Sequence, residues 1–237
     1  MFLALYMLTR VHESDRWVDA ANSRPRSGPL RRIFSVEYRR RTILNTALVT
    51  ISIIGLWAAA VYEPGAIAML ARRTGLNPTE ATRLASFGTG LLSVGTCLGC
   101  LVLPVMAERF GRRRTQAFYF LGMAACIGVS FGWAFYLPDG LSIFIGSLFF
   151  LGLFGGNFAM YNLWLPEQYP TAMRATAFAF VTSFGRYIGA GVNFLIGMGV
   201  HAYGSVGMPV ATTALAFLVG VSLLPLCLET RGERLPA

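Results

Sequence analysis

The sequence predicts an all-α membrane protein in which six transmembrane helices form one six-helix bundle. Hydrophobic residues make up 55% of the 237 residues and charged residues only 13%, which leaves too little charge to cover a soluble globule. Apolar stretches that match the roughly 20 residues of a membrane span recur along the chain. Because lipid offers no partner to backbone N–H and C=O groups, each of these stretches must be helical.

The apolar stretches divide the chain into three parts. Residues 1–42 are expected to hold the end of a preceding membrane helix and then a polar, Arg-rich cytoplasmic loop. The six-helix bundle is expected over residues 43–228, and residues 229–237 form a cytoplasmic tail. Within the bundle, the spans are expected at 43–63, 84–106, 116–137, 141–164, 175–199 and 206–228.

Breaker residues justify the ends of these spans. Pro64-Gly65 break or bend the first span, after which residues 66–73 can continue as a short helix. Asn77-Pro78 mark a loop at 74–83, and Pro138-Asp139-Gly140 mark a tight connection before the fourth span. The remaining connections are short segments at 108–115, 166–174 and 201–205.

Polar residues are unevenly distributed among the spans. The third and sixth spans contain few of them, whereas the first, second, fourth and fifth contain most. This period of three helices is the pattern of two inverted three-helix repeats, with the third and sixth helices facing lipid and the other four lining a polar cavity. Ser and Thr can also bond to their own helix anywhere in a membrane, but that alternative does not explain the Asn, Glu and Arg residues.

Arginine sets the expected orientation. All 20 basic residues are Arg, a bias that genomic base composition explains. With both termini in the cytoplasm, 16 Arg lie on the cytoplasmic side, and only Arg72, Arg73 and Arg83 lie on the other side. We therefore expect a multi-pass protein of the cell membrane with both termini inside. The Arg residues flank apolar runs and form no basic arm with exposed aromatics, so nucleic acid is not expected as a partner.

Small residues at regular spacing predict close helix packing. Gly without a side chain lets two helix backbones approach, and G-x-x-x-G pairs favour such contacts. We expect packing within the chain, with homodimerisation as the alternative. Cys97 and Cys100 match C-x-x-C only by spacing, because they lie inside an apolar run and not after a strand. The Gly pairs are Gly95/Gly99, Gly128/Gly132, Gly152/Gly156 and Gly185/Gly189.

Four loop segments resemble motifs of the major facilitator superfamily, a family of transporters with twelve helices. Val11-His-Glu-Ser-Asp-Arg-Trp17 is similar to the P-E-S-P-R-W segment that follows the sixth helix of sugar-porter-like members. Ala107-Glu-Arg-Phe-Gly-Arg-Arg-Arg114 is similar to the D-R-x-G-R-R loop between helices eight and nine, with Glu108 in place of Asp.

The other two motifs lie toward the C-terminus. Leu165-Pro-Glu-Gln-Tyr-Pro-Thr-Ala-Met-Arg174 is similar to the P-E-x-x-P-T-x-x-R loop between helices ten and eleven. Leu228-Glu-Thr-Arg-Gly232 is similar to the P-E-T-K/R-G segment after helix twelve, with Leu228 in place of Pro. The four motifs occur in the family's order, so the resemblance covers essentially the whole chain and only the second half of the family's fold.

These loops predict a cytoplasmic gate of opposite charges. Such charges can bridge helix ends in one transport state and separate in another, and a network of them can bias a two-state element. Solvated helix ends and charges that only set topology are the alternative. The expected gate residues are Glu13, Arg16, Glu108, Arg109, Arg112, Arg113, Glu167, Arg174, Glu229 and Arg231.

A substrate site is expected near the membrane midplane. Arg186 lies well inside the fifth span, where an Arg needs a partner or water, and it can clamp a carboxylate or phosphate. A structural ion pair is the alternative. Glu63 can carry a proton or lie at a wet outer gate. The candidate substrate-binding residues are Ser52, Glu63, Asn157, Tyr161, Arg186 and Asn193.

The resemblance implies that the chain is the C-terminal half of a secondary active transporter and works with an N-terminal six-helix half. The sugar-porter signature Q-Q-x-S-G-x-N is absent from the first span, so the chain looks more like metabolite:proton symporters for organic acids, with a sugar-like substrate still open. A non-transporting fragment or a partner subunit is an alternative. A membrane-embedded enzyme is not favoured, because the chain shows no nucleophile elbow and no metal-ligating cluster, and no cofactor is expected.

Overall fold

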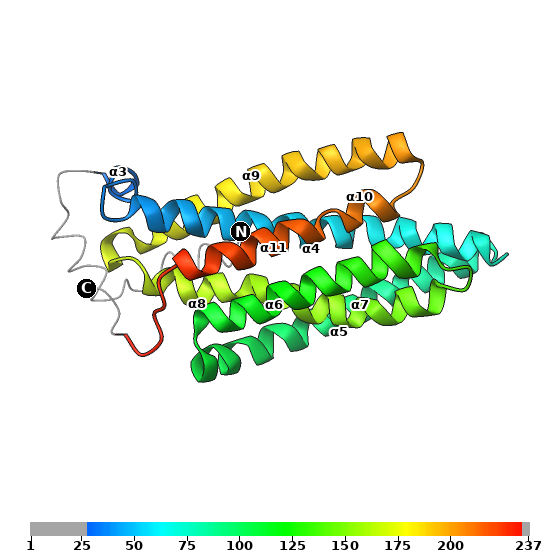
Figure 1. Cartoon of the computed structure of the whole chain (residues 1–237), viewed down its shortest axis with the longest axis horizontal. Coiled ribbons are helices and arrows are strands. Elements are labelled where there is room, and N and C mark those ends of the chain that lie inside the picture. The colour runs from blue at the N-terminus through cyan, green and yellow to red at the C-terminus, as the bar shows by residue number, and fades with distance from the viewer. Residues whose placement is uncertain (1–27, 234–237) are drawn as a thin grey trace, which may run out of the picture.

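The computed structural model describes residues 28–233, which are all-helical. The long helices run side by side along a common axis, and the connections between them lie at its two ends (Figure 1). One end holds the short helix α3 (Pro29–Arg32), the α5–α6 connection, the start of α9 and the segment after α11. We call this the charged end and the opposite one the far end.

The first span is a single helix, α4 (Arg39–Arg73), and it lies at the centre of the bundle. Of the expected break or bend at Pro64-Gly65, the break is wrong, because the helix continues through both residues to Arg73. Pro64 removes one backbone N–H, a loss that neighbouring helices and their side chains can offset in a membrane protein. α4 packs against α5, α9 and α11, and most of its surface is buried.

The second span, α5 (Pro78–Phe110), begins six residues earlier than expected. Asn77 caps it: its side chain accepts a hydrogen bond from the Glu80 N–H at 2.8 Å, and the Asn77 N–H donates to Glu80 Oε2 at 3.2 Å. Pro78 occupies the first helical turn, where a missing N–H costs nothing. The sequence contains the residues of this capping box, but they were expected to belong to a loop at 74–83 and not to the start of the helix.

The third and fourth spans are helices with irregular segments. α6 (Arg112–Ile127) continues as the π-helical η1 (Gly128–Trp133) and the 3₁₀ turn η2 (Ala134–Tyr136). After a tight turn, α7 (Leu141–Gly155) tightens into the 3₁₀ segment η3 (Gly156–Ala159) and then continues as α8 (Met160–Glu167). Short irregular stretches of this kind inside a helix often accompany functional sites.

The last two helices differ in composition. α9 (Thr171–Tyr203) has 33 residues, and the final span joins α10 (Gly207–Ala211), α11 (Ala214–Leu223) and the 3₁₀ turn η4 (Leu224–Leu226). Five helical segments of the described chain are long and apolar enough to cross a membrane. α9 is not among them, because its length suffices but its composition is less apolar.

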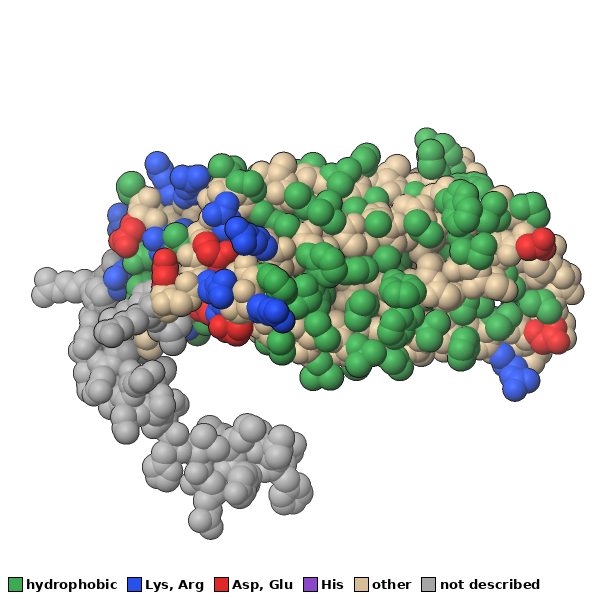
Figure 2. Space-filling model, turned by 60° about the horizontal axis from the view of Figure 1, so that its bottom comes forward, with side chains coloured by type: hydrophobic (Ala, Val, Ile, Leu, Met, Phe, Trp, Pro, Cys, Tyr) green, Lys and Arg blue, Asp and Glu red, His purple; other side chains and the backbone are tan. Residues whose placement is uncertain are grey.

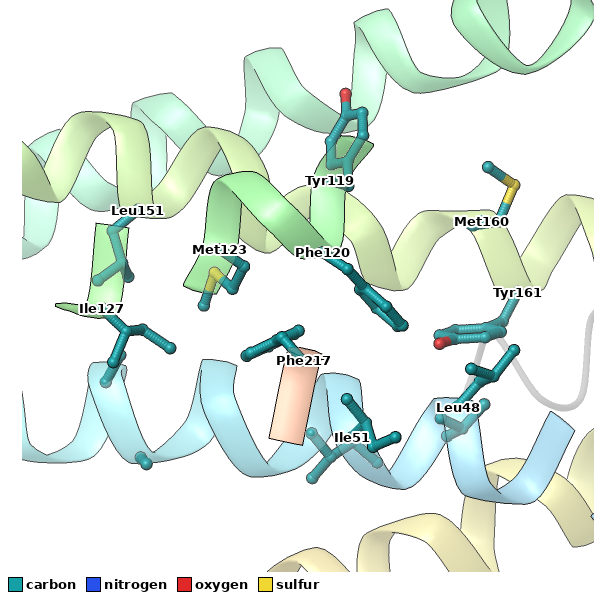
Figure 3. Close-up of a cluster of buried hydrophobic side chains, with 14 of the residues drawn as sticks. Leu48, Ile51, Tyr119, Phe120, Met123, Ile127, Leu151, Met160, Tyr161 and Phe217 are labelled. Atoms are coloured by element: carbon teal, nitrogen blue, oxygen red, sulfur yellow. The ribbon is translucent and has the colours of Figure 1, made fainter. Parts of the chain in front are cut away.

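Aromatic side chains fill the space between α4, α6 and α11 (Figure 3). Phe120 of α6 and Phe217 of α11 meet edge to face, with ring centroids 5.3 Å apart. Gly55 of α4 and Gly220 of α11 lie directly against these two rings, where a larger residue would collide with them. Such edge-to-face pairs favour one arrangement of the three helices.

Glycines bring α5 and α7 into backbone contact. A Cβ at Gly99 would overlap the Leu153 carbonyl oxygen, and a Cβ at Gly152 would overlap the Leu92 carbonyl oxygen. Gly95 and Gly156 are equally tight against the opposite backbone. The expected packing within the chain is therefore confirmed for these two Gly pairs, and Gly185/Gly189 pack similarly against α4 side chains. Gly128 has no neighbour within 4 Å, so the pair Gly128/Gly132 forms no such contact.

Charged side chains gather at the charged end, while the sides of the bundle are largely apolar (Figure 2). The Arg residues at the far end of the described chain are Arg72, Arg73 and Arg83, as the sequence predicts. Arg73 donates to the Phe135 carbonyl at 2.9 Å and covers the Phe135 ring. α6 exposes the large apolar side chains Phe118 and Leu121, and η1 exposes Trp133.

Candidate functional site

A buried ion pair lies at the charged end. Arg112, at the start of α6, bonds Glu167 at the end of α8 through two parallel contacts, Nε to Oε2 at 3.0 Å and Nη2 to Oε1 at 2.6 Å. The side chains are only 5% and 15% exposed. Arg112 also donates to Glu108 at 2.8 Å and to the Ala107 carbonyl at 3.1 Å. This fork geometry is the strong form of an Arg–carboxylate contact.

A second carboxylate caps the N-terminus of α6. Glu229 Oε1 accepts from the Arg112 N–H at 2.9 Å, and Oε2 accepts from the Arg113 N–H at 3.0 Å. An anion at this position meets unpaired N–H groups and the positive end of the helix. The residue before this helix, Gly111, has to be a glycine, because its φ is +91° and a Cβ there would lie 2.9 Å from Glu229 Oε2.

Further bonds attach the C-terminal segment to the helices before it. Arg113 donates to the Leu224 and Pro225 carbonyls at 3.0 and 2.9 Å, and Trp164 donates to the Leu228 carbonyl at 3.0 Å. Thr230 donates to Glu167. Together these contacts join the ends of α5, α6, α8 and the last span, and we call the group the clasp: Glu108, Arg112, Arg113, Trp164, Glu167, Glu229 and Thr230.

The other expected gate residues lie apart from the clasp. Arg109 and Arg231 have exposed side chains and form no ion pair with any residue in 28–233, although Arg109 lies over the Phe110 ring. Arg174 donates to the Tyr169 carbonyl at 3.3 Å. Glu13 and Arg16 lie outside the described residues. The structure therefore brings together five of the expected gate residues within one bundle.

The polar residues of α4 face into the bundle, and each bonds a different element. Asn45 donates to Gln168 Oε1 at 3.0 Å, in the connection between α8 and α9. Ser52 and the Tyr161 hydroxyl of α8 are 2.7 Å apart, and Glu63 accepts from Thr89 of α5 at 3.2 Å. All three α4 residues are at most 1% exposed. These polar side chains of α4 therefore join helices within the bundle.

Tyr161 is the centre of a buried polar group. Its hydroxyl contacts Ser52 and accepts from Gln116 Nε2 of α6 at 3.2 Å, and its ring lies among the apolar side chains shown in Figure 3. Asn157 lies one turn before Tyr161, in η3, and donates to the Phe154 carbonyl at 2.8 Å. Among the described residues, Asn157 Oδ1 and Gln116 Oε1 are buried without a hydrogen-bond partner.

Arg186 and Asn193 lie elsewhere, on α9. Arg186 is exposed near the middle of this helix, beside the Gly185/Gly189 contact with α4, and it forms no ion pair within residues 28–233. Asn193 follows two turns later on the same side, as i, i+7 spacing requires. Its Oδ1 is buried without a partner in the described chain, and Tyr62 of α4 donates to its carbonyl at 3.3 Å.

The six candidate substrate residues thus form two sets. Ser52, Glu63, Asn157 and Tyr161 are buried between helices of the bundle. Arg186 is exposed on α9, whereas Asn193 on the same helix is half-buried. In residues 28–233, no group of three His, Cys, Asp or Glu side chains could hold a metal ion.

Sequence reasoning missed several members of these networks. Trp164 and Thr230 stand inside or directly beside the recognised motifs, so the motifs themselves were the available signal. No signal in the sequence identified Gln116 and Thr89, because a single polar residue in an apolar helix does not reveal its partner on another helix.

Comparison with known proteins identifies one family and relatives of which this chain covers about half. A family model described as "Sugar (and other) transporter" matches residues 19–236. The probable 4-methylmuconolactone transporter of Cupriavidus pinatubonensis is 29% identical over 238 residues, covering 97% of this chain and 51% of that protein. The putative niacin/nicotinamide transporter NiaP of Bacillus subtilis is 21% identical over 225 residues, covering 94% of this chain and 53% of that protein.

The fold has a counterpart among solved structures. The crystal structure of a D-xylose-proton symporter aligns with a TM-score of 0.64 and 16% identity, covering 82% of this chain and 49% of that one. At this identity the likeness shows the fold alone. The chain spans about half the length of the curated relatives named above.

Proposed function

The chain belongs to the sugar (and other) transporter family of the major facilitator superfamily, and on this premise we propose that it is the C-terminal half of a secondary active transporter. It moves a small polar or anionic metabolite by alternating access, together with an N-terminal six-helix half. Alternating access needs two bundles that rock about a site between them, so the chain alone does not transport.

The exposed Arg186 is the observation that carries the substrate class. A cation at membrane depth without an acidic partner must face water, a ligand or another protein surface. Its guanidinium can hold a carboxylate through two parallel hydrogen bonds, and Asn193 adds an amide two turns away. Arg186 therefore binds an anionic substrate or, in its absence, a carboxylate of the other half.

Small organic acids and related ring compounds are the favoured substrates. The two relatives are named for 4-methylmuconolactone and for niacin or nicotinamide, which are small polar ring compounds. A sugar is the second candidate, because the family description and the D-xylose-proton symporter both point to it. The same symporter supports proton coupling as the energy source.

The proposal extends to the arrangement of the helices in the membrane. We take α9 as the sixth span, since its 33 residues can cross a bilayer and a helix that lines an aqueous cavity need not be strongly apolar. α4–α6 and the helices from α7 onward then form two inverted three-helix repeats. The exposed sides of α4, α5 and α9 face the other half, α6 and α11 face lipid, and the charged end is cytoplasmic.

The expected gate residues have two different roles, depending on whether they belong to the clasp. Arg112, Glu167 and Glu229 join helix ends within one bundle, so they make the cytoplasmic end of this half move as a unit. Arg109 and Arg231 remain exposed at the same end and can pair with acidic groups of the other half when the cytoplasmic side is closed. Glu13, Arg16 and Arg174 complete the proposed gate.

Substitution of Arg186 tests the substrate class. In the chain combined with its N-terminal half, Arg186→Ala should raise the KM for an anionic substrate about 10- to 150-fold, the equivalent of losing a charged hydrogen bond of about 1.5–3 kcal/mol. Arg186→Lys should recover part of the affinity, because it restores the charge without the fork. Radiolabelled uptake into proteoliposomes measures both.

The matched control is Leu195→Ala, an exposed apolar residue on the same helix, which should leave the KM unchanged. Unchanged uptake in both Arg186 variants would remove Arg186 from the transport cycle.

A further inference from the structure

Glu63 is a buried carboxyl that the charged networks leave unexplained. It lies on α4 toward the far end, and the residue is 1% exposed. Its neighbours on another helix are Gly88 and Thr89 of α5, and Gly88 also lies against Ile67 of α4 and Leu148 of α7. Gly88 is what lets α5 approach, since a Cβ at that position would lie 3.0 Å from Glu63 Oε1.

No cation balances this carboxyl within residues 28–233. α7 contains no titratable residue, and neither do α10 and α11. On α5 the nearest charged residue along the helix is Arg83, which is exposed at the far end, and Arg73 of α4 bonds the Phe135 carbonyl instead. The remaining titratable groups on α5, α6, α8 and α9 lie further along those helices: Glu80, Cys97, Cys100, Glu108, Arg109, Arg112, Arg113, Arg114, Tyr119, Cys126, Tyr161, Glu167, Arg174, Arg186, Tyr187, His201 and Tyr203.

Hydrogen-bond geometry identifies the protonated form as the one that fits. The Thr89 hydroxyl lies 3.2 and 3.4 Å from the two Glu63 oxygens and 3.0 Å from the Ala85 carbonyl. A hydroxyl has one proton to donate, so Thr89 cannot serve both acceptors. If Glu63 carries a proton, it donates to Thr89 Oγ1, and Thr89 donates to Ala85. The carboxyl proton and the Thr89 proton then each have an acceptor, and no net charge is buried.

We propose that Glu63 and Thr89 form a proton-binding site, in which the Glu63 carboxyl takes up and releases the proton that drives transport. The assignment of this proton to transport rests on the proposed function. On uptake an O–H bond of hydronium on the exposed side of α5 breaks and the Glu63 Oε–H bond forms, leaving water. On release the Glu63 Oε–H bond breaks and the proton returns to water as hydronium.

Thr89 gives the site a route to that water. Glu63 is buried, but Thr89 belongs to the exposed side of α5, together with Ser86 and Ser93. These hydroxyls follow i, i+3 and i+7 spacing and so share one side of the helix. In the assembled transporter this side faces the other half, where a change between outward and inward states alters its contact with water.

Infrared spectroscopy of the purified full chain in lipid tests the site without a substrate. At neutral pH the native chain should show the C=O stretch of a protonated carboxyl, and Glu63→Gln should lose this band completely. Glu63→Gln should also keep the thermal stability of the native chain, because glutamine mimics the neutral carboxyl. The control Asp139→Asn, at an exposed loop position, should leave the band unchanged.

Thr89 supplies the second variant. Thr89→Val should keep the band but shift its frequency, because the carboxyl loses its acceptor, whereas Thr89→Ser should restore the native frequency. A band that persists in Glu63→Gln, or a native chain without the band, would overturn the proposal. These spectra are independent of uptake, so failure of the transport assignment would leave them unchanged, and failure of the spectra would leave the transporter assignment standing.

Discussion

Replacement of Gly99 or Gly152 by alanine should strongly destabilise the protein. Each new Cβ would overlap a backbone carbonyl oxygen of the facing helix, at Leu153 or at Leu92. Backbone cannot rotate away as a side chain can, so α5 and α7 must separate along their length. Overpacking of this kind costs about 1–3 kcal/mol, and the rigid contact places both variants at the upper end. Thermal unfolding in detergent and the yield of monodisperse protein measure the effect.

The same two helices offer matched controls. Gly90 on α5 and Gly146 on α7 have no atom within 4 Å of an added Cβ. Gly90→Ala and Gly146→Ala should therefore be neutral or slightly stabilising, since alanine is a better helix former by up to about 1 kcal/mol. Equal behaviour of Gly99→Ala and Gly90→Ala would show that the close approach of α5 and α7 does not exist.

Replacement of Arg112 by methionine should have an effect at least as large. The substitution keeps much of the volume but leaves Glu167, whose side chain is 15% exposed, without its bidentate partner. Removing one member of a buried pair typically costs about 3–5 kcal/mol. We expect a large fall in the free energy of unfolding, with the ends of α6 and α8 loosened first.

The double variant R112M/E167Q should recover part of this loss, because no buried charge then remains. Arg114→Met is the matched control: Arg114 is exposed, forms no ion pair within the described chain, and should change stability by less than about 1 kcal/mol. If Arg112→Met and Arg114→Met are equally mild, the clasp does not stabilise this end of the bundle. Denaturant titration followed by tryptophan fluorescence provides the comparison.

The helices themselves were predictable because apolar length decides them. The ends of the helices were less predictable. Pro64-Gly65 indicated a break or a bend, whereas α4 continues unbroken to Arg73. The capping box at Asn77 starts α5 earlier than the apolar run alone indicates. A membrane bundle tolerates Pro through its neighbours, and those neighbours are not visible in one segment of sequence.

The candidate sites divide in the same way. The loop motifs located the clasp because they place charges at helix ends, and charges at one end of a bundle meet. For the polar residues of the spans, composition indicated that the first span lines a polar cavity but not that Asn45, Ser52 and Glu63 are buried between helices. Burial depends on which helices pack together, and the Gly contacts that decide this are set by three-dimensional approach.

Uptake by the chain with and without a six-helix partner tests the central claim most directly. The N-terminal half of the 4-methylmuconolactone transporter can be joined to this chain, and proteoliposomes of the fusion and of the chain alone can be compared with labelled lactone, nicotinate and xylose. The account predicts uptake of a small organic acid or lactone by the fusion, driven by an inward proton gradient, and none by the chain alone. Uptake by the chain alone at the rate of the fusion would contradict it.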